Sequence, residues 1–257
     1  MIWLVGLMGN NVHISVILCA NSADFLKEAV DSILSQTFHE FELIVVLNNA
    51  PESAQSLIAD YCKLDDRLVL LNSNISNLSY NLNLGIDIAK GKYIARMDAD
   101  DVSLPSRLAQ QYEFLEKNSD YSLVGSFCNV IDSSGSFLKK ITYPIDHKSI
   151  SYKLAFSNVF CHPAVMFRKS VLYSTGGYKG FKNAQDYELW TDLIFNKKIK
   201  AYNLPQFLIN YRVHKSQSKG KKSSYADMLA VLFRRTLNNP KLIIPFSIRF
   251  FYFFFKR

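Results

Sequence analysis

Strand-like apolar runs alternate with helix-like stretches in the N-terminal part of the chain, and this alternation constrains the fold more than any other feature. His13–Ala20 and Phe41–Leu47 have the length and composition of buried strands. Phe41–Leu47 is nearly continuously apolar, which is typical of a central parallel strand covered on both faces. Between them, Asp24–Gln36 carries apolar residues at i, i+4 and i+8, which predicts a helix with one wide apolar face. This order predicts βαβ units.

The alternation continues to Met97 and changes after Asp101. Up to Met97 we expect a helix over Pro51–Lys63, a strand over Arg67–Leu71, a helix over Asn77–Ala89 and a strand over Lys92–Met97. Further on we expect a helix over Leu104–Lys117 and strands over Tyr121–Asp132 and Phe137–Thr142. The helix over 24–36 is expected to start with Ser22 or Asp24 as its N-cap. The chain is therefore predicted to be an α/β protein whose mainly parallel sheet is flanked by helices.

Size and composition suit one globular domain with a full core and an appendage. The chain has 257 residues, of which 49% are hydrophobic and 14% aromatic, and this excludes a disordered or low-complexity protein. Its four cysteines show neither a disulfide framework nor a CxxC zinc spacing, which favours reduced thiols in the cytoplasm. Met1–Met8 is apolar but lacks the basic segment and cleavage site of a signal peptide.

Polar residues follow two of the predicted strands at their carboxyl ends. Asn48–Asn49 follows one strand, and Asp98–Asp101 follows another. Ligands of open parallel sheets bind beyond the carboxyl ends of the strands. These two segments therefore mark the expected ligand crevice.

Three carboxylates lie within four positions of the second segment. Asp98, Asp100 and Asp101 repel one another unless a cation lies among them. Oxygen ligands of this kind suit Mg²⁺ or Mn²⁺, above all where substrate phosphates complete the coordination. The alternative is a solvated acidic turn in which Asp101 or Ser103 caps the next helix.

Asp186 lies near the start of a predicted helix. It could act as a general base toward a hydroxyl nucleophile, or it could only stabilise the helix N-terminus. His162, which precedes Pro163 and an apolar strand, suits a core histidine as well as a site residue. Arg212 and His214 could meet a phosphate or a metal.

Taken together, these motifs resemble those of the family-2 glycosyltransferases of bacterial surface-polysaccharide synthesis, which are inverting enzymes of the GT-A fold. The resemblance runs in order along residues 13–218 through Ser32–Thr37, Phe41–Val46, Asn81–Ile86, Ala89–Asp101, His162–Pro163, Asp186–Trp190 and Tyr211–His214. Each motif is weak alone, but their common order is specific. The resemblance implies a GT-A Rossmann-like domain over residues 1–218, followed by a helical extension over residues 219–257.

The resemblance also implies roles for the matching residues. Asp98 and Asp100 match the element that meets the ribose and the Mn²⁺ or Mg²⁺ bridging the nucleotide diphosphate, where the cation stabilises the leaving group. Asp186 matches the base that deprotonates the acceptor hydroxyl, so that one displacement inverts the anomeric centre. The residues expected to bind the nucleotide-sugar are Asn21, Asn48, Asn49, Asn81, Arg96, Asp98 and Asp100. Those expected to contact acceptor or donor are His162, Glu188, Trp190 and Arg212, with His214 as a further candidate metal ligand.

Three positions depart from the family pattern. Asn48-Asn49 stands where relatives usually carry an acidic pair, and Cys19-Ala20-Asn21 stands where Pro-Thr-Tyr-Asn is common. Both segments line the nucleobase side of the crevice in relatives, and asparagine can both donate to and accept from a base. Gln185 replaces the usual glutamate before the catalytic base, which would lower the pKa of Asp186 compared with relatives.

The last quarter of the chain is strongly basic. From Lys197 to Arg257 it has 14 Lys and Arg residues and one acid, Asp227, which implies an anionic partner for this part alone. It ends in an aromatic-rich run, Leu242–Phe255, of 14 residues, shorter than the roughly 20 that span a bilayer. The basic residues upstream are Lys219, Lys221, Lys222, Arg234, Arg235 and Lys241, and Lys256 and Arg257 close the chain.

Two readings of this extension remain open. It suits an anchor at the cytoplasmic membrane surface, with cations for anionic headgroups and rings for the acyl boundary. It also suits a helix that docks on the catalytic domain or on another subunit. Nucleic acid is not expected as a partner, because the aromatic residues are grouped together and not interleaved with the cations.

These observations predict a metal-dependent inverting glycosyltransferase. We expect it to move a hexose or N-acetylhexosamine from a nucleotide-sugar, a UDP-sugar by family frequency, to a saccharide acceptor. A lipid-linked acceptor in lipopolysaccharide, lipooligosaccharide or capsule assembly would fit a cytoplasmic enzyme on the inner membrane face. The alternatives are a non-catalytic nucleotide- or glycan-binding relative and a sugar nucleotidyltransferase, whose Gly-rich phosphate loop is missing after the first strand.

Overall fold

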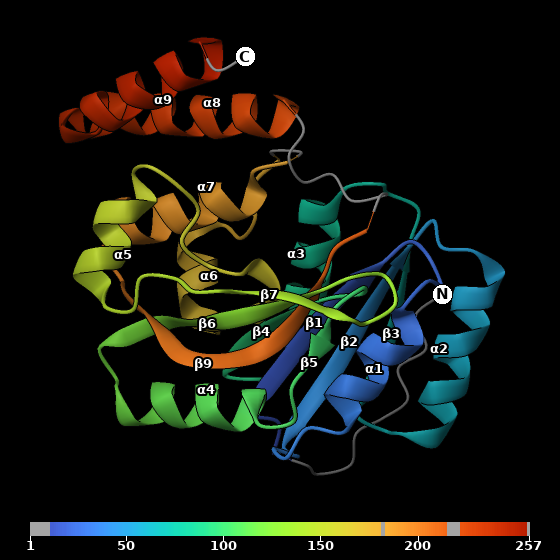
Figure 1. Cartoon of the computed structure of the whole chain (residues 1–257). Helices are drawn as coiled ribbons and strands as arrows, with labels where there is room; N and C mark the ends of the chain where they lie inside the picture. The colour runs from blue at the N-terminus through green and yellow to red at the C-terminus, as the bar shows by residue number, and fades with distance from the viewer. Residues whose placement is uncertain (1–10, 181–182, 215–221, 256–257) are drawn as a thin grey trace.

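A sheet that is parallel in its first half and mixed in its second organises the molecule (Figure 1). The computed structural model describes residues 11–180, 183–214 and 222–255. Within these residues nine strands pair in the order β3-β2-β1-β4-β8-β6-β9-β5, and β7 pairs with β6. The predicted α/β class, with helices on both sides of the sheet, is confirmed.

The parallel half consists of the predicted βαβ units. Its strands are β1 (Ile14–Ala20), β2 (Phe41–Asn48), β3 (Leu68–Ser73) and β4 (Tyr93–Asp98), and β1 pairs in parallel with both β2 and β4. Its helices are α1 (Leu26–Leu34), α2 (Glu52–Leu64) and α3 (Leu78–Ile88). The N-cap predicted for α1 is wrong: Phe25 precedes the helix at φ 60°, and the Ser22 hydroxyl accepts from the Asp24 amide instead.

The mixed half carries the antiparallel pairings. Its strands are β5 (Val102–Ser103), β6 (Tyr121–Ile131), β7 (Phe137–Ile141), β8 (Met166–Arg168) and β9 (Lys200–Arg212). Its helices are α4 (Arg107–Lys117), α5 (His147–Leu154), α6 (Lys169–Thr175) and α7 (Gln185–Thr191), with short helices η1 (His162–Ala164) and η2 (Asp192–Asn196). The sequence pattern had not indicated β9, which runs parallel to β6 and antiparallel to β5.

The core has two parts, one on each face of the sheet. Strand β1 contributes Ile14, Val16 and Leu18 to one part and Ile17 and Cys19 to the other, all fully or almost fully buried. This alternation follows from the two-residue period of a strand. Burial of each such large aliphatic side chain stabilises the fold by about 1.5–3 kcal/mol.

The extension forms a hairpin of two helices that lies against α7 (Figure 1). It consists of α8 (Lys222–Asn238), η3 (Pro240–Leu242) and α9 (Ile243–Phe255). Val231 and Leu232 of α8 are buried, so the second reading, docking on the catalytic domain, holds for α8. In the described chain, no helix combines the length and apolarity needed to cross a membrane. The segment Met1–Met8 and the residues Lys219, Lys221, Lys256 and Arg257 lie outside the described residues.

Candidate functional site: a cleft at the carboxyl ends of the strands

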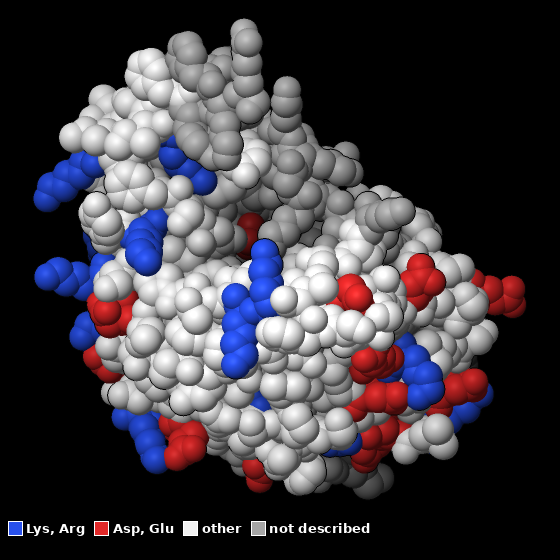
Figure 2. All heavy atoms as spheres, in the orientation of Figure 1, with Lys and Arg blue, Asp and Glu red and all other residues white. Residues whose placement is uncertain are grey.

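A cleft of about 1110 Å³ opens at the carboxyl ends of β1, β2 and β4. Figure 2 shows a hollow below the C-terminal helices, with acidic atoms at its base. One side of the cleft is lined by the ends of these strands, and the other by residues of α7 and of the hairpin. The structure therefore places Asn48 and Asp98 at the crevice that the sheet topology predicted.

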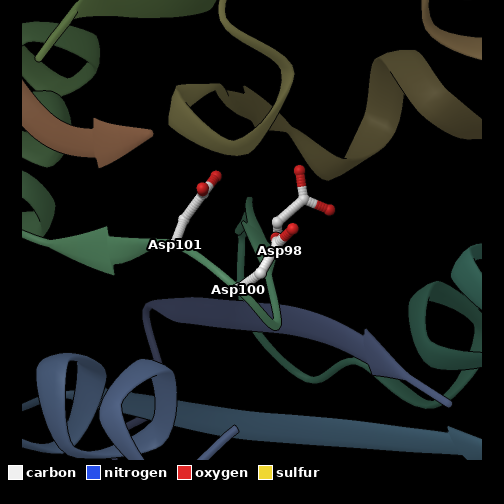
Figure 3. Close-up of side chains that lie close together, drawn as sticks. All are labelled: Asp98, Asp100 and Asp101. Atoms are coloured by element: carbon white, nitrogen blue, oxygen red, sulfur yellow. The ribbon is translucent and has the colours of Figure 1, made fainter. Parts of the chain in front are cut away.

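Three acidic side chains gather at the end of β4 (Figure 3). Asp98, Asp100 and Asp101 each offer a carboxylate oxygen, and these oxygens lie within 4.8 Å of one another. Burial raises the pKa of Asp98, opposed by an ion pair with Arg96 and reinforced by the charges of Asp100 and Asp186. Burial also raises the pKa of Asp101 well above its usual range. The three carboxyl groups thus lie close together in surroundings that disfavour their charge, which a bound cation would relieve.

The donor set fits a divalent cation such as Mg²⁺ or Mn²⁺. Carboxylate oxygens are the hard ligands these ions prefer, and the Nε2 atom of His214 lies 2.9 Å from Oδ2 of Asp100. Asp98 and Asp100 line the cleft, so they are the residues that would hold the ion there. A bound cation would supply positive charge to a diphosphate leaving group.

Asp101 has a different role from its neighbours. Its Oδ1 accepts a 2.7 Å hydrogen bond from the Arg212 amide, and it is almost fully buried. Helix α4 begins after Ser106 without a side-chain cap, so the alternative in which Asp101 or Ser103 caps this helix is wrong. Asp101 instead joins the acidic loop to the end of β9.

Asp186 lies in the first turn of α7 and faces the same cleft. Asn158 donates to its Oδ2 at 2.5 Å, and the Tyr187 amide donates to its Oδ1 at 2.7 Å. Burial raises the pKa of Asp186 above its ordinary value, although these two hydrogen bonds and the charge of Arg96 oppose the rise. A carboxylate whose charge is disfavoured by burial and which is fixed by two donors has the properties of a general base.

Eight of the sequence-predicted site residues line the cleft together: Asn21, Asn48, Arg96, Asp98, Asp100, His162, Asp186 and His214. His162 contacts the Tyr178 hydroxyl at 2.9 Å, and burial, with the charge of Arg96, lowers its pKa well below the usual range. Its imidazole is therefore held in the neutral form, which can donate one hydrogen bond and accept another. Five others, Asn49, Asn81, Glu188, Trp190 and Arg212, are not among the lining residues.

Two of these five brace the loop before α3. Asn49, at φ 46°, donates to the Asn74 carbonyl and to the Ser76 hydroxyl, at 3.2 and 2.7 Å. Asn81 is fully buried and donates to the Ile75 carbonyl at 2.7 Å. Because Ser76 lines the cleft, both asparagines shape it from behind.

Arg212 supports the acidic loop from within the core. It is 1% exposed, its Nε donates to the Asp100 carbonyl at 2.8 Å, and its guanidinium pairs with Glu28. The guanidinium also lies over the Phe25 ring, 4.5 Å from the centroid. Arg212 therefore positions Asp100 and does not reach the cleft.

Glu188 and Trp190 belong to the packing of α7. Trp190 is fully buried and contacts the rings of Phe160 and His162 edge-on. Glu188 is also buried and forms a 2.7 Å ion pair with Arg235 of α8. The motif that includes the candidate base thus also contains the residue that fixes the hairpin.

Several cleft residues have no motif in the sequence that predicts them. Asn158, Tyr143 and the hairpin residues Tyr225, Met228 and Arg249 line the cleft, yet no local motif marks them. Only their tertiary position reveals them. None of the four cysteines, all within the described residues, forms a disulfide, and burial raises the pKa of the cleft residue Cys19 to about 12, so its thiol stays protonated near neutral pH.

Comparison with known proteins agrees with this geometry. The family model "Glycosyl transferase family 2" matches residues 15–176. The chain is 37% identical over 228 residues to the O-antigen biosynthesis glycosyltransferase WbnJ of Escherichia coli, covering 87% of this chain and 89% of that protein.

Solved structures show the same fold. TarS of S. aureus (residues 1–349), in complex with UDP-GlcNAc, matches with a TM-score of 0.74 at 17% identity, over 93% of this chain and 73% of that one. Of a longer TarS chain, the match covers 44%. The mannosyltransferase PcManGT from Pyrobaculum calidifontis, in complex with GDP-Man and Mn²⁺, matches with a TM-score of 0.66 at 18% identity, over 94% of this chain and 69% of that one.

The family match decides against the sugar nucleotidyltransferase alternative. The matched segment covers more than half of the chain and includes the acidic cluster at the end of β4. The GT-A architecture of the solved structures extends the agreement over both halves of the sheet. The chain belongs to family 2 of the glycosyltransferases, and it is a glycosyltransferase.

Proposed function

We propose that the chain transfers a sugar from a nucleotide-sugar to an acceptor hydroxyl in a single inverting displacement. The observation that carries this proposal is the position of Asp186, which faces Asp98 and Asp100 in one cleft. In the step, Asp186 takes the proton of the acceptor hydroxyl, whose oxygen forms a bond to the anomeric carbon. The bond from that carbon to the diphosphate breaks, and the nucleoside diphosphate leaves with the electron pair.

We propose a UDP-sugar, carrying a hexose or N-acetylhexosamine, as the donor. Asn21 and Asn48 would contact the nucleobase, while Asp98 and Asp100 would hold Mn²⁺ or Mg²⁺ at the diphosphate. The support for uridine is the fold shared with TarS, which was solved with UDP-GlcNAc. The support for a metal is the acidic cluster of this chain, together with the Mn²⁺ complex of PcManGT.

We propose a saccharide acceptor, lipid-linked, in the assembly of a surface polysaccharide such as lipopolysaccharide, lipooligosaccharide or capsule. The similarity to WbnJ, an O-antigen enzyme, supports this class of pathway. The enzyme would then work at the cytoplasmic face of the membrane, with residues 1–218 as the catalytic domain and 219–257 as the attachment. Exposed apolar side chains on α9, Ile244, Ile248 and Phe251, suit such a surface.

Calorimetric titration with UDP, GDP and dTDP, each with and without Mn²⁺, tests the donor site. Of the three nucleotides, we expect only UDP to bind, and only when Mn²⁺ is present. The variant Asp100→Asn should lose this binding. Asp186→Asn should retain it, but should lose transfer by about 10²- to 10⁴-fold, because only the proton acceptor is removed. If the folded protein binds none of the nucleotides, the non-catalytic alternative replaces the proposal.

A further inference from the structure

The hairpin supplies one wall of the cleft, beside the candidate base. Tyr225 and Met228 of α8 and Arg249 of α9 line the cleft, next to Asp186 and Tyr187 of α7. The donor site lies across the cleft, at the ends of β1, β2 and β4. An acceptor hydroxyl must reach Asp186 from the side opposite the departing diphosphate. The acceptor therefore has to lie against this wall.

Arg249 places a cation on this wall without a carboxylate to balance it. Its Nη1 donates to the Tyr187 hydroxyl at 3.3 Å, and its Nη2 lies 3.9 Å from the Met228 sulfur. The guanidinium lies 5.5 Å from the centre of the Tyr187 ring. Among the described residues, no carboxylate forms an ion pair with it, whereas Arg96, Arg212 and Arg235 all have such partners. Two weak neutral partners leave most of its five N–H donors available.

Gln185 offers a second unused group at the same place. It lines the cleft, and its Oε1 is buried without a hydrogen-bond partner in the described structure. An unsatisfied buried amide oxygen destabilises the fold, and a sugar hydroxyl that donates to it would relieve this cost. The base, the amide and the cation thus occur together on the acceptor side.

We infer that Arg249 is the phosphate-binding residue of the acceptor subsite, so that the acceptor carries its sugar on a phosphate group. This inference rests on the proposed function, because it presupposes that Asp186 receives the acceptor hydroxyl. The opposite wall is acidic, with Asp98 and Asp100, and repels an anion unless a metal is present. Arg96 also lines the cleft but pairs with Asp98, so Arg249 is the cleft arginine, among those the structure describes, that remains to bind an anion, and arginine binds phosphate through paired N–H donors.

The carrier of the phosphate could be a hydrocarbon chain or a free sugar. Exposed apolar residues such as Ile248 and Phe251 lie on other sides of the helix that carries Arg249, and this apolar surface favours a hydrocarbon chain. The phosphate recognition is the same for both carriers. The test therefore compares ligands that differ only in what the phosphate bears.

The experiment titrates the full chain, saturated with UDP and Mg²⁺, with decyl phosphate below its micelle-forming concentration. Galactose 1-phosphate and inorganic phosphate are titrated in parallel. The variants are Arg249→Gln and Arg249→Lys, and the control is Lys153→Gln, which removes an exposed cation of α5 that does not line the cleft. We expect decyl phosphate to bind the wild type and Arg249→Gln to weaken this binding about 10- to 100-fold. Arg249→Lys should recover part of the loss, and the control should bind normally.

Unchanged binding of decyl phosphate and galactose 1-phosphate by Arg249→Gln overturns the assignment, as does equal binding of inorganic phosphate. Tighter binding of decyl phosphate than of galactose 1-phosphate supports a hydrocarbon chain as the carrier of the phosphate. The reverse order supports a sugar phosphate. Binding of UDP with Mg²⁺ is measured in every variant. If the wild type does not bind UDP with Mg²⁺, the proposed function is contradicted. If Arg249→Gln still binds UDP but has lost decyl phosphate, the substitution affects the phosphate subsite alone.

Discussion

Asp186 carries a charge that its surroundings disfavour. Burial raises its pKa, while the hydrogen bond from Asn158 and the charge of Arg96 lower it. On balance the pKa of Asp186 lies above the ordinary value of 3.8, which makes its carboxylate a stronger base than that of an exposed aspartate. The same balance makes both activity and stability depend on pH, in opposite directions.

Removal of Asn158 should move the acidic limb of the pH–activity profile to higher pH. Asn158 stabilises the charged form of Asp186, so its loss in Asn158→Ala raises the pKa further. Because the base must be deprotonated, activity then falls at a higher pH than in the wild type. The dependence of kcat on pH measures this shift. If kcat falls in Asn158→Ala but the acidic limb stays at the same pH, Asn158 does not determine the pKa of Asp186.

The variant Asp186→Asn should be more stable than the wild type at neutral pH. The folded pKa lies above the unfolded one, so stability is lost as the pH rises through the folded pKa and the buried group ionises. Asparagine avoids this cost. The difference in Tm between the two proteins should shrink as the pH falls toward 3.8. A lower Tm for the variant at all pH values would contradict this account.

At the scale of elements, α8 holds α7 by a buried ion cluster. Arg235, 4% exposed, pairs with Glu188 at 2.7 Å and with Asp192 at 2.8 Å, and Lys179 lies 3.6 Å from Glu188. Burial would raise the pKa of Asp192, but Arg235, Asn196 and Lys179 together lower it. Asp227 of α8 also accepts from the amide of Asn183, just before α7.

Loss of Arg235 should therefore destabilise the protein strongly. The variant Arg235→Met leaves Glu188 and Asp192 buried with less compensation, and removal of one partner from such a cluster costs about 3–5 kcal/mol. Chemical denaturation measures the change. Arg234→Gln is the matched control, since Arg234 is 55% exposed and 3.9 Å from the same glutamate, and should cost at most about 1 kcal/mol. An equal loss of stability in both variants would contradict a stabilising role for the buried ion cluster.

The elements also show what the sequence could and could not predict. Phe41–Leu47 and the helices of the parallel half follow from local periodicity, because each buries one face or both. The sequence pattern did not predict strand β9, because Pro205 is atypical of the inside of a strand. The pairing of β9 with β6 shifts in register between Ser126 and Phe127, at the position of this proline. The family motifs led to Asp98 and Asp186, but they also suggested Glu188 and Trp190, whose contacts are internal. Arg249 depends on helix packing alone, which no local pattern encodes.

At the scale of the whole molecule, the acidic side chains of the cleft and the exposed apolar side chains of α9 lie in different parts of the protein. The acidic cleft lies in the body, whereas the exposed aliphatic and aromatic residues of α9 lie on the hairpin. The proposed membrane contact therefore predicts that apolar residues of α9 can be changed without loss of the donor site. Figure 1 shows this hairpin at one end of the molecule.

The double variant Ile244→Ser/Phe251→Ser should reduce binding to anionic lipid vesicles by at least about tenfold, because two apolar side chains leave the lipid. Sedimentation with vesicles measures the bound fraction, and retained UDP binding shows that the fold is intact. Leu64→Ser, at an 84% exposed position of α2, is the control and should sediment as the wild type does. Full vesicle binding by the double variant would assign α9 to a protein contact instead.

The ion cluster between α7 and α8 also sets an order of events during synthesis. Glu188 and Asp192 leave the ribosome before Arg235, and until it follows they lack the guanidinium that neutralises them in the folded enzyme. The helix that bears Asp186 is thus held only after the basic extension has been translated. A nascent chain can therefore pair its parallel strands β1 to β4 well before the helix that bears Asp186 is fixed in place.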